Sequence, residues 1–408
     1  MVPRLLAALV AALAAPAVLL ACPFCSSQGQ TLAGELASAD MIVVATVVKS
    51  ERDEKDFTKS RTELKIEKTI KPHPAFADQA TLVVPRFIPV EKGKASPQLL
   101  LFCYVNTDTR DPAVAAVASA WGVFPAYHNA SLDAYRGDEI KANSKLPDYL
   151  EQARKLQSAD PQKRLAFYFD HLEADDLFIS SDAYMEFGNA DYKDVREVAK
   201  SVSADTLVKW LKDPNTAPSR YGLYGMLLGH CGKGEHAATL KALIADPDNA
   251  FSLGLDGMLA GYVLLDPKDG WGLLDAIAAD RKKEFTTRYA ALRTVRFFHD
   301  HRPDAVPADK VLATMKTLCE QGDIADIAIE DLRKWHKWDQ ADFVLGLAQK
   351  ETHSDPLVKR AILRYALHAA RTGNRAADEY VEAVRKTKPQ LVKDAEDLLE
   401  NELPKAKK

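Results

Sequence analysis

The second half of the chain is self-similar, and this feature constrains the fold more than any other. Residues 220–229 and 252–261 align position by position, with glycine, leucine and methionine at shared places. Looser copies begin at residues 288, 326 and 359, so successive starts lie 32, 36, 38 and 33 residues apart. Unequal spacing of this size is typical of two-helix repeats whose loops vary in length.

A second amphipathic segment of helical period follows each of these starts. The five segments are residues 236–245, 271–279, 309–319, 340–349 and 376–386. A single helix pair cannot bury its apolar face alone, so neighbouring pairs must stack on one another. We therefore predict an α-solenoid over residues 159–403, capped by the charged segment 390–403, and a disordered tail at residues 404–408.

Residues 22–158 have the patterns of strands instead. The segments are a β-branched run at residues 41–48, an alternating run at 61–70, and short apolar runs at 80–84 and 98–105. Proline-rich connections separate them. Because such sheets avoid exposed edges by closing or twisting strongly, we predict a small antiparallel β-barrel. The predicted fold class is α+β and multidomain, a barrel followed by a solenoid.

The first 21 residues resemble a secretory signal peptide. One charge, Arg4, precedes a run at residues 5–21 made only of Leu, Ala, Val and one Pro. That run falls short of the roughly 20 residues that a membrane span needs. Residues 19–22, Leu-Leu-Ala-Cys, are similar to a bacterial lipobox, so Cys22 is either acylated or simply exposed by cleavage after Ala21; an uncleaved anchor is the third alternative. We expect an exported protein, periplasmic, secreted or lipid-anchored to the cell envelope, whose only membrane attachment is a lipid on Cys22.

The cysteine count is odd. The cysteines are residues 22, 25, 103, 231 and 319. In an oxidising compartment, at least one is then lipidated, free or bonded to another chain. Cys22 and Cys25 have the spacing of redox and zinc sites, but the further zinc ligands and the strand-to-helix context of thioredoxin-type sites are missing. We predict a disulfide between Cys25 and Cys103 of the apolar strand, which leaves Cys22 for the lipid.

Residues 22–106 resemble the netrin-like module of the tissue inhibitors of metalloproteinases. The features are the opening cysteine pair, the strand at residues 39–45, a second long strand, and a strand ending in Leu-Phe-Cys103. The resemblance implies an OB-type β-barrel. It also implies that the amino group of Cys22 approaches the catalytic metal of a target protease, which lipidation would block. This chain opens with Cys-x-x-Cys where the family has Cys-x-Cys, and it has fewer cysteines.

The helical part resembles HEAT-type repeats. Asp-Pro turns precede helices at residues 160–161 and 355–356, and the tetratricopeptide signature is missing. The leader, the Cys-Pro-Phe-Cys segment and the repeats together resemble a family of exported bacterial proteins of uncharacterised function. That resemblance implies an architecture but no activity.

Common nucleotide, hydrolase and zinc-protease signatures are absent from the sequence. His230, Cys231 and His236 offer the imidazole and thiolate ligands of a zinc or copper site, although glycines around them also suit a helix-ending turn. Two further pairs are candidate binding residues: Arg293 with Arg296 as a basic ladder for an anionic partner, and Trp335 with Trp338 as an aromatic platform. Solvated helix faces and solenoid core are the alternatives for these two pairs.

The charge balance excludes one class of function. With 58 acidic and 54 basic residues, the net charge is -4, so there is no global positive field to hold nucleic acid. We predict a non-catalytic exported scaffold, without a cofactor, whose solenoid surface engages a protein or another macromolecule. The alternatives are a metal-dependent or redox enzyme that uses Cys22 and Cys25 or the His230 cluster, and a protease-inhibitor-like module.

Overall fold

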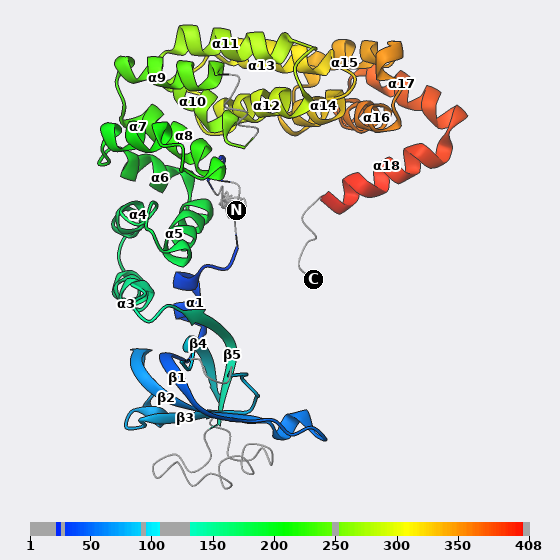
Figure 1. Cartoon of the computed structure of the whole chain (residues 1–408). Coiled ribbons are helices and arrows are strands. Elements are labelled where there is room, and N and C mark those ends of the chain that lie inside the picture. Colours follow the sequence, from blue (N-terminus) through cyan, green and yellow to red (C-terminus); the bar gives the residue numbers. More distant parts are fainter. Residues whose placement is uncertain (1–21, 26–28, 91–94, 107–130, 247–252, 403–408) are drawn as a thin grey trace, which may run out of the picture. The chain divides into compact units, whose positions relative to one another are not determined.

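A computed structural model describes residues 22–25, 29–90, 95–106, 131–246 and 253–402 (Figure 1). The predicted signal peptide and the predicted tail lie outside these residues. The chain divides into two compact units. The first comprises residues 1–22 and 27–198, and the second comprises residues 23–26 and 199–408. The four residues 23–26 therefore belong to the unit that the distant C-terminal half forms.

One antiparallel sheet contains the strands of the first unit. In spatial order they are β3 (Thr81–Val84), β2 (Arg61–Lys71), β1 (Met41–Glu51), β4 (Gln98–Asn106) and β5 (Ser131–Ile140). The four predicted strands are confirmed as β1 to β4, whereas β5 is a strand that the sequence analysis missed. Val43 in the central strand β1 lies opposite Leu101 of β4 and Thr69 of β2.

The predicted closed barrel is wrong. Within the described residues, β3 pairs only with β2 and β5 only with β4, so the sheet has two open edges. A barrel requires the two edge strands to pair along their length. β3 has only four residues, and this is too short to form such a seam. The core of this sheet lies on the face that carries Met41, Val43, Leu64 and Leu101.

Helices complete the first unit. They are α1 (Leu32–Ser38), α3 (Leu146–Leu156), α4 (Pro161–Phe169), α5 (Leu177–Asn189) and α6 (Tyr192–Ala199). Asp160 begins α4 as its N-cap by accepting a hydrogen bond from the Lys163 amide at 2.8 Å, and Pro161 follows at the first helical position. The domain boundary expected near residue 158 lies between α3 and α4, inside this unit.

The second unit is helical. Its helices are α7 (Ala204–Lys212), α8 (Tyr221–Cys231), α9 (Gly234–Ala245), α10 (Leu255–Leu265), α11 (Pro267–Ala279), α12 (Phe285–Asp300), α13 (Ala308–Cys319), α14 (Ala325–Lys334), α15 (Ala341–Leu347), α16 (Pro356–Arg371), α17 (Arg375–Thr387) and α18 (Pro389–Glu402). Helix α10 packs against both α8 and α12, and α16 packs against both α14 and α18. Figure 1 shows α11, α13 and α15 in one row and α10, α12, α14 and α16 in another. None of the helices in the described segments is both long and apolar enough to span a membrane.

The aligned glycines explain why α8 and α10 pack so closely. A methyl group on Gly257 would lie 2.0 Å from the carbonyl oxygen of Gly222, and one on Gly261 would lie 2.0 Å from that of Gly225. Any larger residue would force the helix backbones apart. The two best-matched copies of the repeat are therefore also each other's packing surface.

Candidate functional site

Cys22 and Cys25 form a disulfide with each other. The predicted bond between Cys25 and Cys103 is therefore wrong. Cys103 is a free, fully buried thiol in the core of the sheet, opposite Met41 of β1, and burial raises its pKa to about 12. Closing the short Cys-Pro-Phe-Cys loop requires little ordering of the chain, which explains the preference for the near partner. A Cys22 sulfur held in this bond cannot also carry a lipid thioether.

The turn that this disulfide closes is packed against the helices of the second unit. Phe24 is 3% exposed, and its ring centroid lies 4.8 Å from that of Phe297 on α12. Arg293, one turn earlier on α12, donates a hydrogen bond of 2.6 Å to the carbonyl oxygen of Pro23. On α8, Gly222 leaves room for the chain, since a methyl group there would lie 2.9 Å from the carbonyl oxygen of Phe24.

A buried carboxylate fixes the arginine of this site. The Asp256 carboxylate on α10 is 3.0 Å from the Nε atom of Arg293, and it also accepts a hydrogen bond of 2.9 Å from the Gly257 amide. Burial raises the pKa of Asp256 above its ordinary value, although the charge of Arg293 opposes this shift. We call Gly222, Asp256, Arg293 and Phe297 the turn seat. Its groups can hold an aromatic side chain and a main-chain carbonyl, which are both features of a polypeptide.

The other candidate binding residues join neighbouring helices. Arg296 forms an ion pair of 2.7 Å with Asp331 on α14. The Trp335 ring stacks on His299 at a centroid distance of 3.8 Å, and Trp338 lies edge-on to Tyr365 of α16. The basic ladder and the aromatic platform thus take part in contacts between consecutive helices. Arg293 differs from them, because it also binds a segment outside the helices.

The predicted metal cluster surrounds the turn between α8 and α9. The His236 ring accepts a hydrogen bond of 2.8 Å from the Lys233 amide and so caps the start of α9. Burial raises the pKa of the free Cys231 thiol to about 11, which keeps it protonated near neutral pH. Across the described segments, no group of three or more His, Cys, Asp and Glu side chains is arranged to hold a metal ion.

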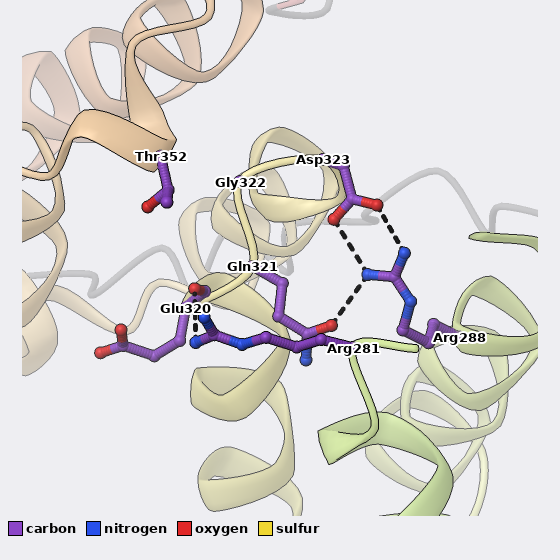
Figure 2. A pocket seen from close by; sticks show the side chains of 7 residues that line it. All are labelled: Arg281, Arg288, Glu320, Gln321, Gly322, Asp323 and Thr352. Atoms are coloured by element: carbon purple, nitrogen blue, oxygen red, sulfur yellow. Dashed lines mark hydrogen bonds and ion pairs between the residues drawn. The ribbon is translucent and has the colours of Figure 1, made fainter. Parts of the chain in front are cut away.

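A small cavity lies where the loops of successive helix pairs meet (Figure 2). Its volume is about 310 Å³, and its walls are formed by Arg281, Arg288, Glu320, Gln321, Gly322, Asp323 and Thr352. Arg288 donates to both carboxylate oxygens of Asp323, at 2.9 and 2.5 Å, and to the Gln321 side chain at 2.8 Å. The hydrogen bonds from Arg288, together with its charge, lower the pKa of Asp323. Arg288 and Asp323 are thus paired with each other, and they join α12 to the turn before α14.

Sequence reasoning missed two acids in the first unit, of which Asp182 is buried and Glu186 is half-buried. Asp182 and Glu186 lie one turn apart on α5. Asp182 accepts hydrogen bonds from the Leu32 amide at 2.5 Å and the Tyr149 hydroxyl at 2.8 Å, while Glu186 accepts one of 2.5 Å from the Thr31 hydroxyl. Burial raises the pKa of both carboxyls, that of Asp182 to about 6. Two acids at this spacing within an apolar helix were the available signal.

Comparison with known proteins adds no relative: no protein-family model, curated protein or solved structure matches this chain. The netrin-like and HEAT-type resemblances therefore stay hypotheses.

Proposed function

We propose that this protein is a non-catalytic scaffold whose helical unit binds polypeptide segments. The observation that carries the proposal is the turn seat. There, α12 already holds a segment that is some 270 residues away from it in sequence, through an aromatic contact with Phe24 and a hydrogen bond to Pro23. Aromatic anchors in closely packed pockets are a general feature of protein interfaces.

The repeat architecture is part of the proposal. Side-chain contacts between helices recur at about one repeat length, as in the hydrogen bonds from Thr294 to Asp256 and from Arg296 to Asp331, which join residues 38 and 35 positions apart. A stack in which each repeat contacts the next in register is expected of an α-solenoid of HEAT type. Solenoids present extended surfaces that suit macromolecular partners.

Two observations favour a scaffold over the redox or metal enzyme. The cysteines of the disulfide are 2% and 7% exposed, whereas a redox-active disulfide needs a thiol that a substrate can reach. Buried acids such as Asp256 and Asp331 face arginines and hold helices together. The leader-like first 21 residues and the disulfide support an exported location, because disulfides persist in oxidising compartments.

A cyclised peptide can test the turn seat. The Phe24→Ala variant removes the ring from the seat and leaves space for another aromatic side chain. We expect a disulfide-closed Cys-Pro-Phe-Cys peptide to give saturation-transfer NMR signals from its phenyl ring with this variant but not with the wild type. A Cys-Pro-Ala-Cys peptide controls for binding through the peptide backbone. The Phe285→Ala variant, at an exposed position on α12, controls for the loss of a phenyl ring elsewhere on the protein. Equal signals with Phe24→Ala and Phe285→Ala would contradict the proposal.

A further inference from the structure

The first unit contains a cavity whose lining residues are distant in sequence from the turn seat. It is a groove of about 1000 Å³ formed by the end of β5, the turn into α3, and the turn between α4 and α5. Residues 139–152 form one part of its lining and residues 170–179 the other. The groove and the turn seat have no residue in common, so the groove is a separate candidate site.

Negative charge dominates the lining of this groove. Six carboxylates line it, against two lysines, and the acids are Glu139, Asp148, Asp170, Glu173, Asp175 and Asp176. Asp148 forms an ion pair with Lys68, and Asp176 caps α5 by accepting a hydrogen bond of 3.0 Å from the Phe178 amide. Glu139, Asp170 and Asp175 are exposed and form no side-chain hydrogen bond or ion pair with any described residue. Acids concentrated in a cleft focus a negative potential that attracts cations.

The same groove also exposes apolar and aromatic surface. Leu177 and Phe178, at the start of α5, are 78% and 42% exposed. Deeper in the lining, the Tyr149 and His171 rings meet edge to face with centroids 5.1 Å apart. Exposed large apolar side chains beside a cleft mark interaction surfaces. A metal ion would use the carboxylates but leave Leu177 and Phe178 in water.

We propose that this groove binds a cationic polypeptide segment that carries arginine or lysine together with an apolar side chain. The unpaired carboxylates of Glu139, Asp170 and Asp175 attract the cations, and Leu177 and Phe178 cover the apolar side chain. Arginine has a further advantage, because its guanidinium can also stack on aromatic faces such as that of Phe178. The charge of the groove repels nucleic acid and anionic lipid.

The test is a binding titration of the full chain with a fluorescently labelled peptide of alternating arginine and leucine. The groove variant is Glu139→Gln with Asp170→Asn and Asp175→Asn, and the matched control is Asp309→Asn with Glu351→Gln and Asp378→Asn, three exposed acids of the helical unit. We expect the groove variant to bind about tenfold more weakly or worse, since each exposed charge pair contributes modestly. The control variant should bind as the wild type does.

Two further arms separate charge from apolar contact. Phe178→Ala should weaken binding several-fold without changing its dependence on salt, whereas the groove variant should flatten that dependence. A peptide of alternating glutamate and leucine should not bind. The proposal is overturned if the arginine peptide fails to bind the wild type, if groove and control variants bind it equally, or if the glutamate peptide binds as well.

Discussion

The two units each hold a segment from near the start of the chain, and they do so with opposite chemistry. In the first unit, the Asp182 carboxylate accepts a hydrogen bond from the Leu32 main-chain amide. In the helical unit, the Arg293 guanidinium donates one to the Pro23 main-chain carbonyl. Arg293 forms an ion pair with the carboxylate of Asp256, whereas Asp182 has another acid, Glu186, as its neighbour. Burial raises the pKa of both Asp182 and Asp256, that of Asp182 to about 6, while the charge of Arg293 opposes the shift at Asp256.

The largest expected effect comes from removing the acid behind the arginine. Asp256→Ala leaves the Arg293 guanidinium without its partner. Because the Arg293 side chain is 36% exposed and solvent screens its charge, we expect the low end of the cost of breaking a buried ion pair, about 3 kcal/mol. We expect this loss in the free energy of unfolding of the helical unit, measured by urea titration and circular dichroism. Asp304→Ala, which removes an exposed acid paired with Arg302, is the matched control and should cost less than about 1 kcal/mol. Equal losses of unfolding free energy in the two variants would show that the pair of Asp256 with Arg293 stabilises the protein no more than an exposed ion pair does.

Changing pH should affect the first unit in the opposite sense to ordinary acid denaturation. The pKa of Asp182 is about 6 when folded, above its usual value of 3.8, so the folded state binds the proton more tightly. This contribution is complete below about pH 4 and is lost as pH rises through about 6, at most about 3 kcal/mol. Glu186, whose pKa is also raised, adds to it with the same sign.

The Asp182→Asn variant isolates this contribution, because the amide keeps the shape of the carboxyl but cannot ionise. We expect unfolding of the first unit in this variant to depend less on pH between about 4 and 6 than in the wild type. Hydrogen exchange of the Leu32 amide reports on the contact directly. An unchanged pH profile would show that Asp182 does not titrate in this range.

Removing the disulfide should have an intermediate effect on the turn seat and on the helical unit that contains it. A bond that closes so short a loop stabilises by about 2 kcal/mol. We expect the pair Cys22→Ser with Cys25→Ser to expose Phe24 and to lower the melting temperature of the helical unit, while the first unit retains its own. Loss of the contact between Phe24 and Phe297 can be followed by NMR. The suitable control is Cys231→Ser, which alters a partly exposed free thiol. Cys103→Ser is unsuitable because that thiol is buried.

The smallest effect is expected at the cap of α1. Thr31 accepts a hydrogen bond of 2.7 Å from the Gly34 amide and donates one to Glu186. Thr31→Ala removes both and should cost the first unit about 1 kcal/mol. Thr31→Ser keeps the hydroxyl and should cost only a few tenths. If both variants lose the same stability in urea titrations, packing of the threonine methyl group matters more than the cap.

The regular elements were predictable because their patterns are local. The runs that became β1 and β2 alternate or are β-branched, and each predicted helix of the repeats is present close to its expected bounds. Strand β5 was missed because residues 131–140 mix charged and small residues and contain Gly137. Its pairing with β4, which places Gly137 opposite Leu101, supplies the order that its own composition does not.

The candidate sites were less predictable, because each depends on residues that are distant in sequence. Arg293 was singled out for its charge, but its partners Asp256 and Pro23 belong to segments 37 and 270 residues away. The acidic groove likewise joins residues 139–152, which reach into α3, with residues 170–179, which follow α4. A short stretch of sequence does not show which distant residues will meet at either site.

Sequence alone determined where strands give way to helices and how often the helical pattern recurs, since periodicity and turn residues act over a few positions. Tertiary structure alone decided that the sheet stays open, that Cys103 is buried as a free thiol in the core of the sheet, and that the turn closed by Cys22 and Cys25 lies against α8 and α12. The physical reason is that burial and pairing depend on which surfaces meet across the folded chain. One buried carboxylate, Asp256, lies beside an arginine and another, Asp182, lies beside a second acid, and only the fold brings either neighbour to it.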